Sequence, residues 1–198
     1  GDAVLIAIGR KPNTEELNLE AAGVKVTERG AIEVNNKLKT NIPNIWAIGD
    51  VNGGPQFTYI SLDDFRIIKD NLFGEGNRST DDRKFIPYSV FIEPNLSRGG
   101  LSEKEALEKG FEIKTAKLDV NTIPRAKVIG ETEGIMKAIV DVKTNKILGC
   151  TLLCAESAEI INIVTLAMKA DEDYTFLRDN IFTHPTMSEA LNDLFSLI

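Results

Sequence analysis

This sequence of 198 residues has little histidine or cysteine and no long apolar run. Each of these features excludes certain classes of function. The chain has one histidine and two cysteines. No apolar run reaches the roughly 18 residues of a membrane-spanning helix, and no basic start with an apolar core suggests a secretory signal. A net charge of -7 and a pI near 4.9 argue against nucleic acid as a partner. We therefore expect a cytoplasmic protein without a membrane span.

A glycine-rich dinucleotide fingerprint is also missing, although the chain holds 15 glycines. The Gly-x-Gly-x-x-Gly turn lets backbone N–H groups approach a pyrophosphate closely. No such spacing occurs anywhere in the sequence. The chain by itself is therefore predicted to bind little dinucleotide.

The two cysteines do not have the spacing of a redox pair. Cys150 and Cys154 lie in the apolar run 146–154, which predicts a buried strand. Four residues along a strand span roughly 13 Å, whereas a disulfide tolerates roughly 7 Å between Cα atoms. We predict two buried, reduced thiols, and no metal site.

The single histidine, His184, stands in the most informative stretch, residues 182–189. Thr186 and Glu189 have capping-box spacing, which predicts a helix starting there with the histidine just before it. A carboxylate in the first turn can reach back, orient the imidazole and favour its charged form. His184 and Glu189 are therefore a candidate acid–base pair. A histidine in this position can also serve only for capping or packing.

A second candidate site surrounds Asp50. Residues 45–48 predict a buried strand with Asp50 at its C-terminal edge, where open α/β sheets bind ligands. A carboxylate there can accept hydrogen bonds from sugar-like hydroxyl groups. The alternative is an aspartate that only shapes a turn.

The remaining pattern predicts two parts joined by a polar boundary. In the first, residues 3–8 predict a buried strand, residues 17–22 a short helix, residues 24–34 a hairpin and residues 57–73 a helix. Residues 75–84 have no apolar side chain and predict a solvated linker. Beyond them the pattern predicts an α+β fold with an antiparallel sheet. Its strands are expected at 88–92, 112–120, 134–142 and 146–154, and its helices at 102–109 and 158–170.

Three motifs together resemble the flavin-dependent pyridine nucleotide-disulfide oxidoreductases, the family of dihydrolipoamide dehydrogenase and glutathione reductase. They are Ala-x-Gly-Arg-x-Pro-Asn at 7–13, Thr-x4-Ile-Trp-Ala-Ile-Gly-Asp at 40–50, and His-Pro-Thr-x-Ser-Glu at 184–189. The resemblance covers the whole chain, yet the chain covers less than half of the family's enzyme. It implies that residues 1–80 are part of the flavin-binding domain and that residues 85–198 are the dimerisation domain.

The resemblance also implies roles for single residues. His184 would be the acid–base partner of a redox-active cysteine pair on the other subunit of a homodimer, with Glu189 holding it. Asp50, beside Gly49, would bind the ribityl chain of FAD. Backbone groups of Gln56, Phe57 and Thr58 are further candidate flavin contacts.

The whole reductase would use FAD and NAD(P)H, and this chain would be its C-terminal fragment, without the N-terminal FAD and NAD(P) domains. Residues 57–59 are similar to the mercuric-reductase-like branch, but the C-terminal cysteine pair of true mercuric reductases is missing. The electron acceptor and the choice between NADH and NADPH stay open. The alternative is a stand-alone, non-catalytic dimerisation or scaffold module.

Overall fold

The computed structural model describes the whole chain, residues 1–198, as two compact units. The first spans Gly1–Arg83 and the second Lys84–Ile198. Each unit has a hydrophobic cluster of its own. No helix of the structure combines the length and the hydrophobicity needed to cross a membrane.

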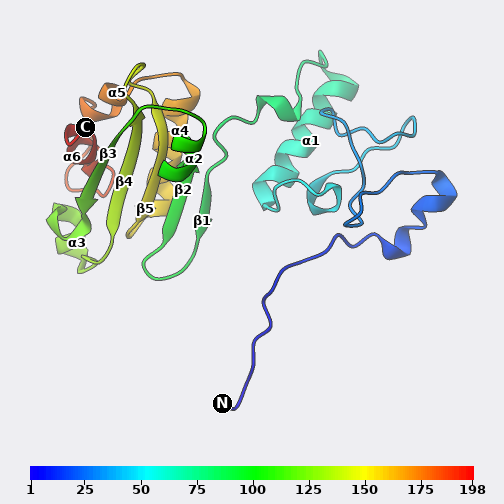
Figure 1. Cartoon of the computed structure of the whole chain (residues 1–198), viewed down its shortest axis with the longest axis horizontal. Helices are drawn as coiled ribbons and strands as arrows, with labels where there is room; N and C mark the ends of the chain where they lie inside the picture. Colours follow the sequence, from blue (N-terminus) through cyan, green and yellow to red (C-terminus); the bar gives the residue numbers. More distant parts are fainter. The chain divides into compact units, whose positions relative to one another are not determined.

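Five antiparallel strands form the sheet of the second unit, in the order β1-β2-β5-β4-β3 (Figure 1). They are β1 Tyr88–Val90, β2 Leu96–Gly100, β3 Ile113–Asp119, β4 Ile135–Asp141 and β5 Ile147–Leu153. A tight turn joins β4 to β5, and Asn145 in it adopts the left-handed φ of 57° that such turns favour.

Five helices accompany this sheet, which confirms the predicted α+β fold. They are α2 Glu103–Glu108, α3 Pro124–Ile129, α4 Ser157–Lys169, α5 Tyr174–Arg178 and α6 Ala190–Ser196. α4 and α6 bury their apolar stripes in the main core together with β4 and β5. α2 is tied to side chains of the sheet by two ion pairs, Arg98–Glu105 and Lys137–Glu103.

β2 and α3 were not predicted, for different reasons. β2 reads Leu-Ser-Arg-Gly-Gly, which lacks the apolar alternation of a strand. Its small residues are needed because α4 lies close: a Cβ on Gly99 would come within 2.5 Å of Thr165 Cγ2. α3 carried readable signals, since it begins at Pro124 and ends at Gly130 with a φ of 78°.

The first unit is built from one long helix and several short turns. α1 spans Thr58–Phe73, close to the predicted helix 57–73. Four 3₁₀ turns precede or follow it: η1 Glu15–Leu17, η2 Leu19–Ala22, η3 Gly49–Asn52 and η4 Thr80–Asp82. The predicted hairpin is present with a single bridge between Val26 and Ile32.

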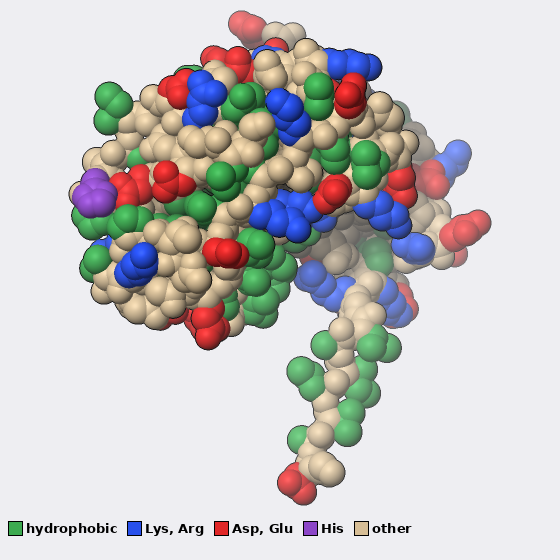
Figure 2. Space-filling view, turned by 60° about the vertical axis from the view of Figure 1, so that its left-hand side comes forward, with side chains coloured by type: hydrophobic (Ala, Val, Ile, Leu, Met, Phe, Trp, Pro, Cys, Tyr) green, Lys and Arg blue, Asp and Glu red, His purple; other side chains and the backbone are tan.

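Two predicted strands of this unit are absent. Residues 3–8 are extended and exposed, with Val4 at 88% and Ile8 at 95%, and their green side chains stand free in Figure 2. Residues 45–48 form only an isolated bridge, from Trp46 to Lys39. A strand requires hydrogen-bonded neighbours along its length. Residues 3–8 have no such neighbour within residues 1–198, and residues 45–48 pair only briefly with residues 38–40.

The polar run 75–84 is not a solvated linker throughout, which corrects the sequence reading. Arg83 is almost buried, at 11% side-chain exposure, and pairs with Asp63 and Asp64 of α1. Arg78 also pairs with Asp63, at 2.8 Å. The sequence alone predicted exposure because the same charged residue types occur in buried ion pairs and on solvated surfaces.

Candidate functional site

The structure brings the imidazole of His184 and the carboxylate of Glu189 into hydrogen-bond contact. His184 Nδ1 lies 2.8 Å from Glu189 Oε2 and 3.1 Å from Oε1. The predicted capping box is half formed, because Thr186 Oγ1 accepts the Glu189 N–H at 3.3 Å. The Glu189 carboxylate turns to the imidazole, and α6 has no side-chain cap.

Packing of α6 holds Glu189 in place, and hydrogen bonds to the same helix hold the chain that leads to His184. Glu189 directly precedes α6, whose apolar face is inaccessible to solvent: Ala190, Leu191, Leu194 and Phe195 are each 0% exposed, as is Met187 just before the helix. Asn192 Nδ2 lies 2.9 Å from the carbonyl oxygens of Leu177, Arg178 and Asn180, and so ties the segment leading to the histidine onto α6. The pair is therefore positioned by packing, not by a flexible loop alone.

The imidazole itself reaches solvent. The His184 side chain is 70% exposed, whereas Glu189 is 17% exposed, and Figure 2 shows the purple ring at the surface. A carboxylate accepts hydrogen bonds, so the proton of the neutral ring belongs on Nδ1. Nε2 is then the atom that can exchange a proton with a bound group.

Asp50 stands in the first unit, on the 3₁₀ turn η3. Its side chain is half exposed, at 49%, and one carboxylate oxygen lies 3.9 Å from a guanidinium nitrogen of Arg10. Gly49 has a φ of 75°, which favours glycine there. The carboxylate therefore faces outward and can accept hydrogen bonds from a ligand.

Asp64 was missed by the sequence reading, although it anchors this turn. Asp64 Oδ2 accepts the Gly49 N–H at 2.7 Å and the Asn52 side-chain N–H at 3.2 Å, and its other oxygen pairs with Arg83. The residue is 0% exposed. A signal existed, because Asp64 lies in helical register with the buried Ile60 and Ile67. A charge on the buried face of a helix indicates a specific partner.

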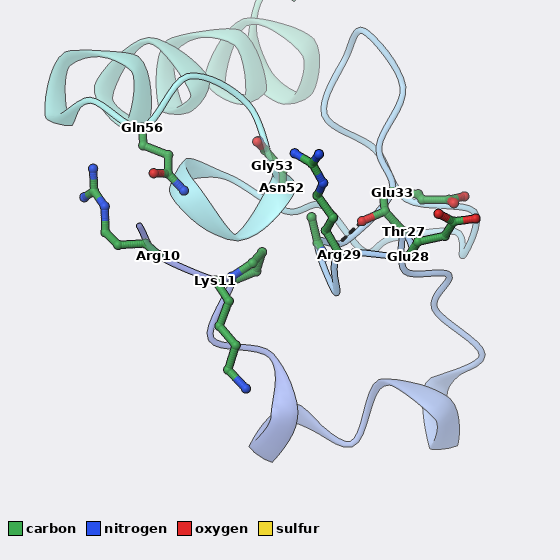
Figure 3. A pocket seen from close by; sticks show the side chains of 11 residues that line it. Arg10, Lys11, Thr27, Glu28, Arg29, Glu33, Asn52, Gly53 and Gln56 are labelled. Atoms are coloured by element: carbon green, nitrogen blue, oxygen red, sulfur yellow. Dashed lines mark hydrogen bonds between the residues drawn. The ribbon is translucent and has the colours of Figure 1, made fainter. Parts of the chain in front are cut away.

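The other candidate flavin contacts lie at the start of α1. Gln56 lines a hollow of about 860 Å³ together with Arg10, Arg29, Asn52 and Gly53. Gln56 reaches into it from the loop before α1, and Arg29 from the hairpin (Figure 3). Phe57 does not line this hollow; its ring stacks on Tyr59, with centroids 5.0 Å apart. Thr58 is the first residue of α1 and does not line it either.

Both cysteines are free and buried, which confirms the prediction of two reduced thiols. Burial raises the pKa of Cys150 and of Cys154 to about 12 in each case. A thiol with such a pKa is a poor nucleophile at neutral pH. Residues 1–198 contain no cluster of three or more histidine, cysteine or acidic side chains that could hold a metal ion.

Comparison with known families gives two matches. Residues 86–195 match the dimerisation domain of the pyridine nucleotide-disulphide oxidoreductases. Residues 1–64 match the domain described as pyridine nucleotide-disulphide oxidoreductase.

Individual relatives agree with these matches. The probable pyridine nucleotide-disulfide oxidoreductase RclA of Escherichia coli K12 is 59% identical over 197 residues, which cover 100% of this chain and 45% of that protein. A mercuric reductase of Staphylococcus aureus is 40% identical over 190 residues, covering 96% and 35%. A dihydrolipoyl dehydrogenase of Mycobacterium tuberculosis is 35% identical over 194 residues, covering 98% and 42%.

A solved structure, the HOCl-induced flavoprotein disulfide reductase RclA from Escherichia coli, aligns with a TM-score of 0.97 at 59% identity. The alignment covers 100% of this chain and 45% of that one. The chain thus spans less than half the length of these relatives.

Proposed function

The chain belongs to the pyridine nucleotide-disulphide oxidoreductases, and from this membership we propose that it serves an FAD- and NAD(P)H-dependent disulfide reductase. Within that enzyme it supplies the dimer interface and the acid–base pair His184–Glu189. The observation that carries the proposal is the 2.8 Å hydrogen bond from Nδ1 to the carboxylate, beside a solvent-facing Nε2.

The two parts of the chain divide this work. Residues 1–80 contribute to the flavin-binding domain, and residues 85–198 form the dimerisation domain of a homodimer. In such a dimer His184 serves the cysteine pair of the partner subunit, a role that the resemblance to the family implies. Cys150 and Cys154 are both buried, so neither is a candidate for that pair. The rest of the enzyme, with its glycine-rich turns, supplies the larger part of the cofactor sites.

The residues around Asp50 fit part of an FAD site. The outward-facing carboxylate suits a ribityl hydroxyl, and Gln56, at the start of α1, lines the same hollow as residues of its turn. A bound FAD would supply the electron transfer between NAD(P)H and the disulfide. Asp50 would accept hydrogen bonds from the sugar-like chain, and backbone groups of Gln56, Phe57 and Thr58 would be further contacts for the flavin.

In this proposal His184 transfers a proton during reduction of the disulfide. Glu189 accepts the Nδ1–H and keeps the ring in one orientation, so Nε2 points to the incoming thiol or thiolate. Nε2 takes a proton from a thiol when a thiolate is needed, and returns it to the product. The protonated ring also stabilises a neighbouring thiolate by charge.

The alternative function, a non-catalytic dimerisation module, does not require the contact between His184 and Glu189. A histidine with only a structural role is not expected to be oriented by a carboxylate and yet exposed at Nε2. The contact therefore favours the reductase.

The experiment is stopped-flow kinetics of the full-length enzyme with His184→Gln. We expect turnover to fall by roughly 10²–10⁴-fold, the usual contribution of a general acid–base group. Reduction of the flavin by NAD(P)H should be spared, because the histidine acts on the disulfide side.

Glu189→Gln is the matched variant. It should lower turnover less than His184→Gln, since it loosens the ring without removing it. Unchanged turnover in His184→Gln, or a defect limited to flavin reduction, would assign the pair a structural role and refute the proposal.

A further inference from the structure

Two adjacent carboxylates of α1 share one arginine but have different second partners. Asp63 binds Arg83 Nε and Arg78, each at 2.8 Å. Asp64 pairs with the other end of the Arg83 guanidinium and also accepts from Gly49 and Asn52. Only Asp64 therefore connects the helix to the turn that carries Asp50.

The two contacts of Asp64 bracket Asp50. Gly49 and Asn52 are the first and last residues of η3, and Asp50 lies between them. Fixing both ends of so short a turn leaves the Cα–Cβ direction of Asp50 little freedom. Asn52 is itself held, because its Oδ1 accepts the Gly54 N–H at 2.9 Å.

Arg83 offsets the free-energy cost of burying the Asp64 carboxylate. A carboxylate without access to water is strongly destabilising unless it is paired and hydrogen-bonded. Burial would raise the pKa of the neighbouring Asp63, yet the hydrogen bonds from Arg83 and Arg78 hold it below its ordinary value. The same guanidinium supplies the countercharge for Asp64, which explains why the polar residues 78–83 return to α1.

We propose that Asp64 is a positioning residue for the flavin site: it clamps the turn Gly49–Asn52 so that the Asp50 carboxylate is presented to the ribityl chain, with Arg83 as its counterion. This inference rests on the proposed function. It predicts that cofactor binding depends on a carboxylate that never touches the cofactor.

The test compares Asp64→Asn with Asp63→Asn in the full-length flavoprotein. Each variant removes one carboxylate charge beside Arg83, but only the first alters the contacts to the turn. Asp64→Asn should raise the dissociation constant for FAD about tenfold, because the Gly49 N–H loses its charged acceptor. It should also change the visible absorption band of the bound flavin. Asp63→Asn should change the dissociation constant by less than about twofold and leave the band unaltered, since its hydrogen bonds do not reach η3.

Amide hydrogen exchange in the 198-residue chain separates the clamp from the cofactor. The Gly49 amide should exchange faster in Asp64→Asn than in Asp63→Asn. Should Asp64→Asn fail to fold, Asn52→Ala removes one clamp contact without burying an unpaired charge, and in it too the Gly49 amide should exchange faster than in Asp63→Asn.

Four results decide between the explanations. Equal loss of FAD affinity in Asp63→Asn and Asp64→Asn, or an unaltered affinity in folded Asp64→Asn, would overturn the positioning role. Equal exchange of the Gly49 amide in both variants would overturn the clamp itself. A wild-type enzyme that binds no FAD would refute the proposed function, and the role of Asp64 toward the flavin with it.

Discussion

Among single residues, Glu189 decides how His184 is presented. The capping-box spacing offers its carboxylate two partners, the Thr186 N–H and the imidazole. The backbone N–H of Glu189 already bonds Thr186 Oγ1, so one half of the box forms without the carboxylate. The carboxylate is then free to accept Nδ1–H. A residue pattern that signals a helix start thus also orients the imidazole of His184.

A second residue-scale expectation concerns the thiols. Because burial raises the pKa of Cys150 and Cys154 to about 12, both should resist a thiol reagent such as dithionitrobenzoate at pH 8. The native chain should release almost no thionitrobenzoate over minutes, and the urea-unfolded chain should release two equivalents, one for each cysteine. Rapid labelling of either cysteine in the native state would contradict the burial of both thiols.

Among the helices, α2 is stabilised by hydrogen bonds in its first turn. Ser102 Oγ accepts the Glu105 N–H at 3.2 Å, and the Glu105 carboxylate accepts the Ser102 N–H at 2.7 Å. Arg98 of β2 binds the same carboxylate. Hydrogen bonds from Ser102, with a further one from Arg98, lower the pKa of Glu105 to about 2. The cap therefore joins the helix to the sheet.

Glu105→Gln should lower the melting temperature by a few degrees at neutral pH. The sign follows from the lowered pKa. The carboxylate stabilises the fold above its unfolded pKa of about 4.3, and this contribution is lost as the pH falls toward about 2. The melting temperatures of wild type and variant should therefore converge between those values, measured by thermal scans.

Glu108→Gln is the matched control on the same helix. Glu108 and its partner Lys104 are both exposed and 3.8 Å apart, so their pair contributes little. A melting-temperature loss in Glu108→Gln as large as in Glu105→Gln would show that net charge, and not the cap, is responsible.

In the molecule as a whole, large apolar side chains of the second unit remain exposed on and beside α4, α5 and α6. They are Leu166 at 66%, Phe176 at 51%, Ile181 at 95% and Leu197 at 55%. The match of residues 86–195 to a dimerisation domain gives this exposure a reason. An isologous contact would cover these side chains in both copies at once.

The 198-residue chain should therefore form a two-fold dimer in solution. Light scattering at high micromolar concentration should report about twice the chain mass of 21.8 kDa. Leu166→Glu should shift the population toward monomer, because a charge would be buried in the interface. Leu107→Glu is the control, since Leu107 is similarly exposed, at 55%, but lies on α2. A wild-type chain that stays monomeric, or equal effects of both substitutions, would count against this interface.

The sequence by itself determined the elements whose signals are local. The strands β3, β4 and β5 and the helix α4 follow from runs of apolar residues at strand or helix period. The closeness of His184 and Glu189 follows from five residues of separation across a helix start. The Asp50 turn was located by its motif. In each case the interacting residues are near neighbours in the chain.

The tertiary structure alone decided the features that depend on distant partners. β2 exists because β1 and β5 pair with its small residues under α4, whereas residues 3–8 have strand character but no partner strand. Asp64 anchors the Asp50 turn because the tertiary fold brings Gly49 and Arg83, both distant in sequence, into contact with its carboxylate. A pattern along one segment records its preference for a conformation. Hydrogen-bonded neighbours and counterions come from elsewhere in the chain, and they determine whether that preference is realised.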